Sequence, residues 1–353
     1  MKKKNLLFSS ATTALAITIS LVIALVIILC VSEQPGQAVT ALLLGPLRST
    51  RLIGSIFTTA IPICFTGLAV CLMFQASMFN MCAEGSFFLG ALAAAAFATK
   101  VPLPGILGLA GPMLVGAAAG ALLCLVPAWL KAKLNASEMV ASLMLNYIAL
   151  YLGLYVLNTY LRDQSFGALA SEKLPDSSKL DKIIPGTSIH SGIFLAVFFI
   201  VLCFLLLYKT SLGHKIRTYG QNPRFTKYAG IKVGSVIILS QVLGGAIAGI
   251  GGSVEVMGMY ERFQWTSLPG YGWDGVILAI LARNKPQYVP LAAIFLSYLR
   301  VGASTMASNT DVPKELITVI QAIMIMLITA TALLKGMKQK MVIKEALSSG
   351  TDS

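Results

Sequence analysis

Long runs without any Lys, Arg, Asp or Glu divide this sequence into apolar segments. A helix needs about 20 mostly apolar residues to cross the hydrocarbon core of a bilayer. Only 12% of the 353 residues are charged, against about a quarter in soluble domains. We therefore predict an all-α fold, a polytopic membrane helix bundle with about ten transmembrane helices. The expected spans are 5–32, 53–83, 86–99, 101–130, 139–161, 183–208, 233–254, 275–283, 288–306 and 316–334.

The distribution of basic residues predicts the orientation of these spans. Lys2, Lys3 and Lys4 precede the first span, so the N-terminus is placed in the cytoplasm, and an even number of spans returns the C-terminus there. In this topology 17 of the 27 Lys and Arg residues lie in cytoplasmic segments and nine in extracellular ones. The net charge of +13 then reflects topology, and no nucleic-acid partner is expected. The first span is expected to remain as an uncleaved anchor.

Two loops stand out between the spans. The extracellular loop 158–191 carries mixed charges, and a docking surface and a plain solvated loop are equally open interpretations. The cytoplasmic loop 209–233 is basic, as the positive-inside rule requires. That rule does not account for Phe225 and Tyr228 among the charges, which are residue types typical of docking surfaces. Within it, a short helix is expected over about 224–231, ended by Gly230.

Several kinds of chemistry are missing from the sequence. It contains no G-x-x-x-x-G-K-[ST] motif, which excludes a nucleotide site of the P-loop type. The string from Gly270 to Gly275 matches G-x-G-x-x-G, but no strand precedes it, so we reject a dinucleotide site. The sequence has only two histidines, so a metal site built from histidines is not expected. With no catalytic triad in view, we expect a chain that is no enzyme and binds no metal or cofactor.

Polar residues inside apolar runs are the candidate functional groups, because such groups are costly in a membrane. Glu84 separates two uncharged runs and is expected to line a pathway, to fix a helix break, or to face water in a short turn. Asp274 is expected to line the pathway or to cap a helix. Asn146 lies in mid-span and needs a hydrogen-bonding partner. The motifs 116–120 and 245–249, both G-x-x-x-G, permit close helix packing.

Four motifs together resemble one protein family. They are FNMCAEG at 79–85, LNY at 145–147, LGHKIRTYGQNPRFTKYAGI at 212–231 and GYGWDGVILAILA at 270–282. This chain is similar to the permease subunits of bacterial ABC importers for nucleosides and simple sugars, the ribose-permease-like group, and resembles the nucleoside branch more closely. Cys82 stands where a glycine is usual and Trp273 where phenylalanine is more common.

The resemblance implies one transmembrane permease domain over 1–345, with a cytoplasmic tail at 346–353, in the bacterial cytoplasmic membrane. It implies a second homologous permease, a cytoplasmic ABC ATPase that binds the ATP and Mg²⁺, and an extracellular substrate-binding lipoprotein. Import of a simple sugar such as ribose is the first alternative, and an ion-coupled secondary transporter or a membrane scaffold is less favoured.

The same resemblance assigns roles to individual residues. The substrate pathway between the two permeases would be lined or shaped by Phe79, Asn80, Glu84, Asn146, Trp273 and Asp274. The loop 209–233 would couple the permease to the ATPase. Its matching residues are Arg217, Gly220, Asn222, Pro223, Tyr228, Ala229 and Gly230.

Overall fold

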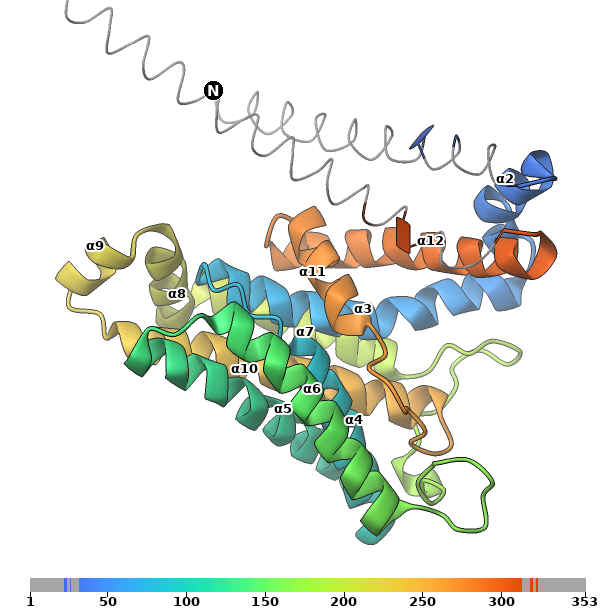
Figure 1. Cartoon of the computed structure of the whole chain (residues 1–353), viewed down its shortest axis with the longest axis horizontal. Coiled ribbons are helices and arrows are strands. Elements are labelled where there is room, and N and C mark those ends of the chain that lie inside the picture. Colours follow the sequence, from blue (N-terminus) through green and yellow to red (C-terminus); the bar gives the residue numbers. More distant parts are fainter. Residues whose placement is uncertain (1–21, 24–25, 27–31, 313–317, 320–321, 323–353) are drawn as a thin grey trace, which may run out of the picture. The chain divides into compact units, whose positions relative to one another are not determined.

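The structure, a computed structural model, describes residues 22–23, 26, 32–312, 318–319 and 322 (Figure 1). They fall into two compact units. Unit 1 combines residues up to Arg48 with residues from Leu299 onward, and unit 2 runs from Ser49 to Tyr298. Apart from a few positions, the expected first span, last span and cytoplasmic tail lie outside the described residues.

The described part of the chain is built from helices and contains no β-strand, which confirms the all-α prediction. Two isolated β-bridges occur in the loop that precedes α7. The helices are α2 (Pro35–Leu43), α3 (Thr50–Gln75), α4 (Ala83–Lys100), α5 (Ile106–Leu134), α6 (Glu138–Val156), α7 (Gly192–Lys209), α8 (Ser211–Gln221), α9 (Pro223–Tyr228), α10 (Val233–Met259), α11 (Tyr271–Leu281) and α12 (Val289–Asn309).

Six described helical segments are long and apolar enough to cross a membrane. Each coincides with an expected span, so the prediction of a multi-pass membrane protein is confirmed. The count of ten spans and the cytoplasmic location of both termini stay predictions. The six segments are Thr50–Gln75, Ile106–Leu134, Glu138–Leu161, Gly192–Lys209, Val233–Met259 and Pro286–Asn309.

The expected span at 275–283 differs from the structure. Helix α11 begins at Tyr271 and has 11 residues, a length of about 16 Å at 1.5 Å per residue. The hydrocarbon core of a bilayer is about 30 Å thick, so α11 is too short to cross alone. The non-helical residues 260–270 connect α10 to α11.

Close contact between α4, α5 and α10 forms the centre of unit 2. A methyl group built on Gly120 would lie 2.2 Å from the carbonyl oxygen of Gly245, and one built on Gly249 would lie 2.2 Å from that of Gly116. The two G-x-x-x-G motifs therefore face each other, as their spacing predicts. A methyl on Gly90 of α4 would lie 2.4 Å from the Cα of Gly249, so all three backbones meet at these glycines.

Loops that the predicted topology assigns to opposite sides of the membrane lie at opposite ends of unit 2. At one end, Gln75 donates through Nε2 to the carbonyl of Asn284 at 2.5 Å. At the other, Arg262 pairs with Asp163 and Leu180 N–H donates to the carbonyl of Met257 at 2.9 Å. The Arg262 guanidinium and the Ser165 hydroxyl lower the pKa of Asp163 to about 2, with Ser165 the larger cause. The grouping agrees with the predicted topology.

Unit 1 is a small cluster of its own. Ala38 and Leu42 of α2 pack against Ala303 and Met306 of α12. The Asp311 carboxylate accepts hydrogen bonds from Ser32 Oγ at 2.7 Å and from the Glu33 N–H at 2.8 Å. These bonds lower the pKa of Asp311.

We expect Gly249→Ala to destabilise the chain. The added methyl group has no room between α4 and α5, and overpacking a helix contact costs about 1–3 kcal/mol, which exceeds the gain of about 1 kcal/mol in helix propensity. The measurement is the thermal unfolding midpoint of the detergent-purified chain. Gly167→Ala is the matched control, since a methyl there meets nothing within 4 Å. Equal midpoints for the two variants would contradict the packing argument.

Candidate functional site

The Glu84 carboxylate is buried, with 1% of the residue exposed. Its Oε1 accepts a hydrogen bond from the Gly270 N–H at 2.6 Å, and its Oε2 accepts one from the Gly272 N–H. Gly270 precedes α11 with a φ of +84°, a left-handed conformation that glycine adopts without strain. A negative charge is favourable at a helix N-terminus, so Glu84 joins the start of α4 to the start of α11. The alternative of a water-facing turn is wrong.

This junction lies deep inside the bundle. A methyl group built on Gly275 would lie 2.7 Å from the main chain of Thr66, near the middle of α3. Asn284, just beyond α11, contacts Gln75 at the end of α3. Helix α11 therefore runs alongside the second half of α3, and Gly272 lies about half-way along α3. Glu84 thus joins two helix starts inside the bundle, and its place in a substrate pathway stays a prediction.

Asn80 and Asn146 hold the segment that leads to Glu84. Asn146 Oδ1 accepts from the Gly85 N–H at 3.0 Å, and its Nδ2 donates to the Met81 carbonyl at 2.9 Å. Asn80 Oδ1 accepts from the Cys82 N–H, and its Nδ2 donates to Gln241 Oε1, both at 2.7 Å. The partners that a buried amide requires in a span are thus main-chain groups of this segment and a glutamine of α10.

The remaining predicted pathway residues differ in exposure. Asp274 is buried in the first turn of α11, where a carboxylate is favoured by the helix dipole. Trp273 is 51% exposed and Phe79 is 40% exposed. The Phe79 ring stacks on Phe74 with 4.9 Å between centroids. The four polar residues are therefore buried, while the two aromatic rings present surface from chain segments that those residues hold in place.

A second polar pair was not among the predicted site residues. Tyr271 Oη lies 3.3 Å from Oε1 of Glu255, a buried residue of α10. The Phe87 ring contacts Tyr271 at 5.2 Å and is stacked with Trp265 at 5.7 Å, both measured between centroids. The available signal was a carboxylate directly after the expected span 233–254, but its aromatic neighbours come from other parts of the sequence.

The cytoplasmic loop of the predicted topology forms α8 and α9. The buried residues of α8, Ile216 and Tyr219, pack in one cluster with Val236 of α10. A methyl group on Gly220 would lie 2.0 Å from the Gln75 carbonyl oxygen, and the Gly220 carbonyl accepts from Ser77 Oγ at 2.7 Å. Only glycine fits at this position, and α8 is fixed against the end of α3.

Helix α9 is shorter than the expected 224–231. Asn222 caps it by accepting from the Phe225 N–H at 3.0 Å, and Pro223 occupies the first turn, a position that proline favours. The helix ends at Tyr228, Ala229 follows as its C-cap, and Gly230 turns the chain with a φ of +74°. The turn at Gly230 after the helix is thus confirmed, whereas the expected bounds are wrong at both ends.

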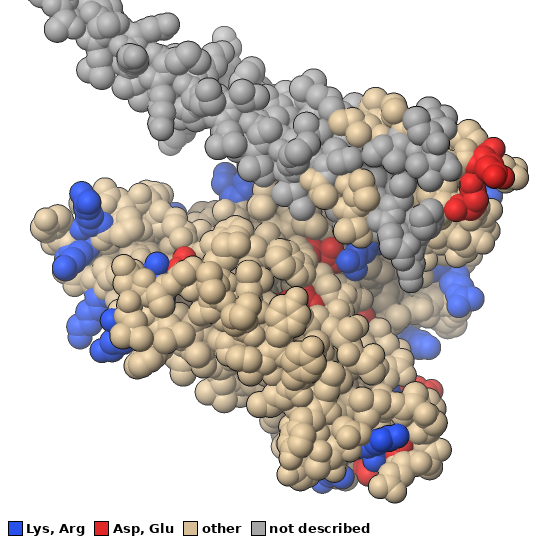
Figure 2. Space-filling view, in the orientation of Figure 1, with Lys and Arg blue, Asp and Glu red and all other residues tan. Residues whose placement is uncertain are grey.

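The predicted coupling residues face in two directions. Tyr228 is 90% exposed and Ala229 is also exposed, whereas the Arg217 guanidinium lies over the Tyr208 ring at 5.0 Å. Figure 2 shows Lys and Arg side chains gathered at the end that carries α8 and α9. Arg217 and Gly220 therefore hold α8 on the bundle, and α9 presents the free surface.

We expect Glu84→Gln to lower stability by about 1–3 kcal/mol, because an amide offers one acceptor oxygen and leaves a buried N–H unsatisfied. The thermal unfolding midpoint of the purified chain measures this. Glu172→Gln is the matched control, since Glu172 forms an exposed ion pair with Lys100, a kind of pair that contributes little. A midpoint for Glu84→Gln equal to that of Glu172→Gln would show that the junction does not depend on the charge.

Known proteins match this chain over most of its length. Residues 52–329 match the family of permease components of branched-chain amino acid transport systems. A glucose ABC transporter permease of Haloferax volcanii, TsgB13, is 31% identical over 92% of this chain and 88% of its own. The guanosine ABC transporter permease NupP of Bacillus subtilis is 29% identical over 90% and 92%. The nucleoside ABC transporter permease NupB of Lactococcus lactis is 28% identical over 92% of both.

No solved structure matches the chain significantly. The family match covers well over half of the sequence, and it agrees with the six apolar helices that can cross a membrane. The chain is thus a multi-pass protein of the cytoplasmic membrane and a transport component rather than an enzyme. It belongs to the family of ABC transporter permease components.

Proposed function

We propose that this chain is the permease of an ATP-driven importer that takes up nucleosides. Its similarity along nearly the whole length to permeases named for guanosine and for nucleosides carries this proposal. The exposed rings of Phe79 and Trp273 suit the flat face of a nucleobase, because aromatic groups stack favourably. Their neighbours Asn80, Glu84 and Asp274 are buried. These polar residues therefore support the pathway wall without contacting the substrate.

The proposal includes three partner proteins. Because the chain has no P-loop, the ATP and Mg²⁺ are assigned to a cytoplasmic ABC ATPase, and this chain holds no cofactor. A second homologous permease completes the pathway. An extracellular lipoprotein delivers the substrate, and the ordered loop 158–191 is the surface offered to it.

Helix α9 is the proposed contact with the ATPase. Of residues 222–230, only Thr226 is buried, so Phe225 and Tyr228 present aromatic surface to solvent between basic side chains. Exposed aromatic residues of this kind form the centres of many protein interfaces. The Asn222 cap and the Gly230 turn fix the helix at both ends, which suits a rigid coupling element.

Import of a sugar is the second candidate, because the relative of Haloferax volcanii is named for glucose. A sugar ring also stacks on exposed aromatic side chains. The nucleoside and sugar candidates have the same architecture. They are distinguished by which unlabelled compound competes with the labelled substrate for uptake.

We expect cells that contain this chain and its partners to take up radiolabelled guanosine, and cells without it to lose that uptake. Excess unlabelled nucleoside should abolish the signal, while glucose and ribose should leave it unchanged. If glucose or ribose reduced the uptake and unlabelled nucleoside did not, the chain would instead be a sugar permease.

The same assay tests the aromatic surface. Trp273→Ala should reduce uptake about tenfold, within the range of about 1–3 kcal/mol for base–aromatic stacking, and Trp273→Phe should retain it. The matched control is Trp129→Ala, since Trp129 of α5 has a similar exposure of 49%. Equal uptake by both alanine variants would remove Trp273 from the pathway.

We expect Tyr228→Ala and Ala229→Arg to uncouple ATP hydrolysis from transport while the two permeases still assemble. Loss of an interface tyrosine costs about 2 kcal/mol or more, so ATPase affinity should fall about 30-fold. The measurement is substrate-stimulated ATP hydrolysis by the reconstituted transporter. Tyr151→Ala is the control, because Tyr151 is also exposed but lies within α6, outside both α9 and the loop 158–191. Normal coupling in both test variants would show that the loop 209–233 does not contact the ATPase, and that its basic residues only determine the topology.

A further inference from the structure

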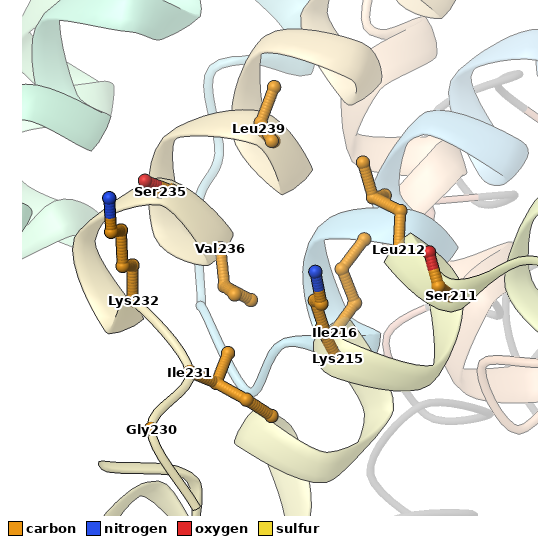
Figure 3. Close-up of a pocket in the computed structure, with 10 residues that line it drawn as sticks. All are labelled: Ser211, Leu212, Lys215, Ile216, Gly230, Ile231, Lys232, Ser235, Val236 and Leu239. Carbon is orange, nitrogen blue, oxygen red and sulfur yellow. The ribbon is translucent and has the colours of Figure 1, made fainter.

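A groove of about 480 Å³ lies between α8 and the start of α10, beside α9 (Figure 3). One wall is formed by residues of α8 and the other by the first turns of α10, and Ile231 lies between them. The lining residues are Ser211, Leu212, Lys215, Ile216, Gly230, Ile231, Lys232, Ser235, Val236 and Leu239.

The charge of the groove is entirely positive. Lys215 and Lys232 line it and no acidic residue does. Among the described residues, neither lysine forms a salt bridge, although Lys131 at the same end pairs with Glu138 at 3.0 Å. Lys232 is also the N-cap residue of α10 and no side chain caps that helix, so the positive end of the helix dipole adds to the field. The groove is therefore complementary to an anion.

The position of the groove relates it to the membrane. Helix α7 ends at Lys209, directly before α8, and α10 begins at Val233, directly after Lys232. The lysines therefore lie at the end of two membrane-crossing helices. Further along α10, Leu239 is 42% exposed, and Leu205 in the last turns of α7 is exposed as well. The groove thus ends at an exposed apolar side chain on a helix that can cross a membrane.

We propose that this groove binds the headgroup of an anionic phospholipid from the leaflet at this end of the bundle. The phosphate would lie between Lys215 and Lys232, with the hydroxyls of Ser211 and Ser235 as donors, and an acyl chain would follow Leu239. Basic side chains next to membrane helices attract anionic lipids in this way.

An acidic segment of a partner protein is the competing occupant. The exposed aromatic side chains that favour a protein partner are on α9, outside the groove. The groove instead combines lysines and hydroxyls with an apolar wall that continues along a membrane helix. The lipid therefore fits better, and its binding requires neither substrate nor ATPase, so this inference and the proposed function fail independently.

The test is native mass spectrometry of the full chain purified in detergent, with phosphatidylglycerol or phosphatidylcholine added at equal concentration. We expect retention of phosphatidylglycerol over phosphatidylcholine. The double variant Lys215→Gln/Lys232→Gln should weaken this retention about 30-fold, since each lysine near a membrane surface contributes about fivefold. Arg224→Gln/Lys227→Gln, which removes the same charge from α9, is the matched control and should retain the lipid.

A further variant separates a site from general surface charge. Ser235→Trp keeps both lysines and fills the groove, so it should also lose the lipid. Equal lipid retention by wild type and Lys215→Gln/Lys232→Gln, or equal loss in the α9 control, would overturn the proposal. Displacement by millimolar inorganic phosphate would indicate a free anion site instead. Loss of ATPase binding by the groove variants with lipid retention unchanged would assign the groove to the protein partner.

Discussion

The bond between the Glu84 carboxylate and the backbone of α11 determines how the centre of unit 2 is arranged. A carboxylate buried in a membrane protein is costly unless donors surround it. The N–H groups of Gly270 and Gly272 supply them, and a helix start is one of the few places where main-chain donors are free. The chain can therefore stop and restart helices at membrane depth, where unsatisfied backbone groups are not tolerated.

A junction of this kind needs a rigid surrounding, and the glycines of α4, α5 and α10 provide it. Gly90, Gly120 and Gly249 let three backbones approach until no methyl group fits between them. In lipid, such contacts replace the hydrophobic effect as the source of helix association. Asn146 then attaches α6 to the same segment through two hydrogen bonds, so every helix around Glu84 is held by a specific contact.

Six of the expected spans and the glycine contacts follow from local composition and spacing, and the sequence predicted both. The start and length of α11 did not follow, because Glu84 determines them and it lies far away in the chain. The same limit applies to α9, whose terminating glycine was predicted while its last residue was placed too late. Arg217 had been grouped with the coupling surface, yet its position over Tyr208 depends on packing between helices. Burial of Glu255 beside Tyr271 is likewise set by tertiary structure.

The loop between α3 and α4 places the two candidate surfaces in one continuous structure. Ser77 bonds the Gly220 carbonyl at the end of α8, and the chain then passes through Phe79 to Glu84. If α9 is the contact with the ATPase proposed above, a displacement of α9 and α8 would reach this loop through the hydrogen bond from Ser77 and the close backbone contact of Gly220 with Gln75. Glu84 bonds the start of α11 at the far end of the loop, so such a displacement would act either on the exposed Phe79 or on the start of α11. Both outcomes alter the surface proposed to meet the substrate, which gives coupling a physical route without any flexible linker.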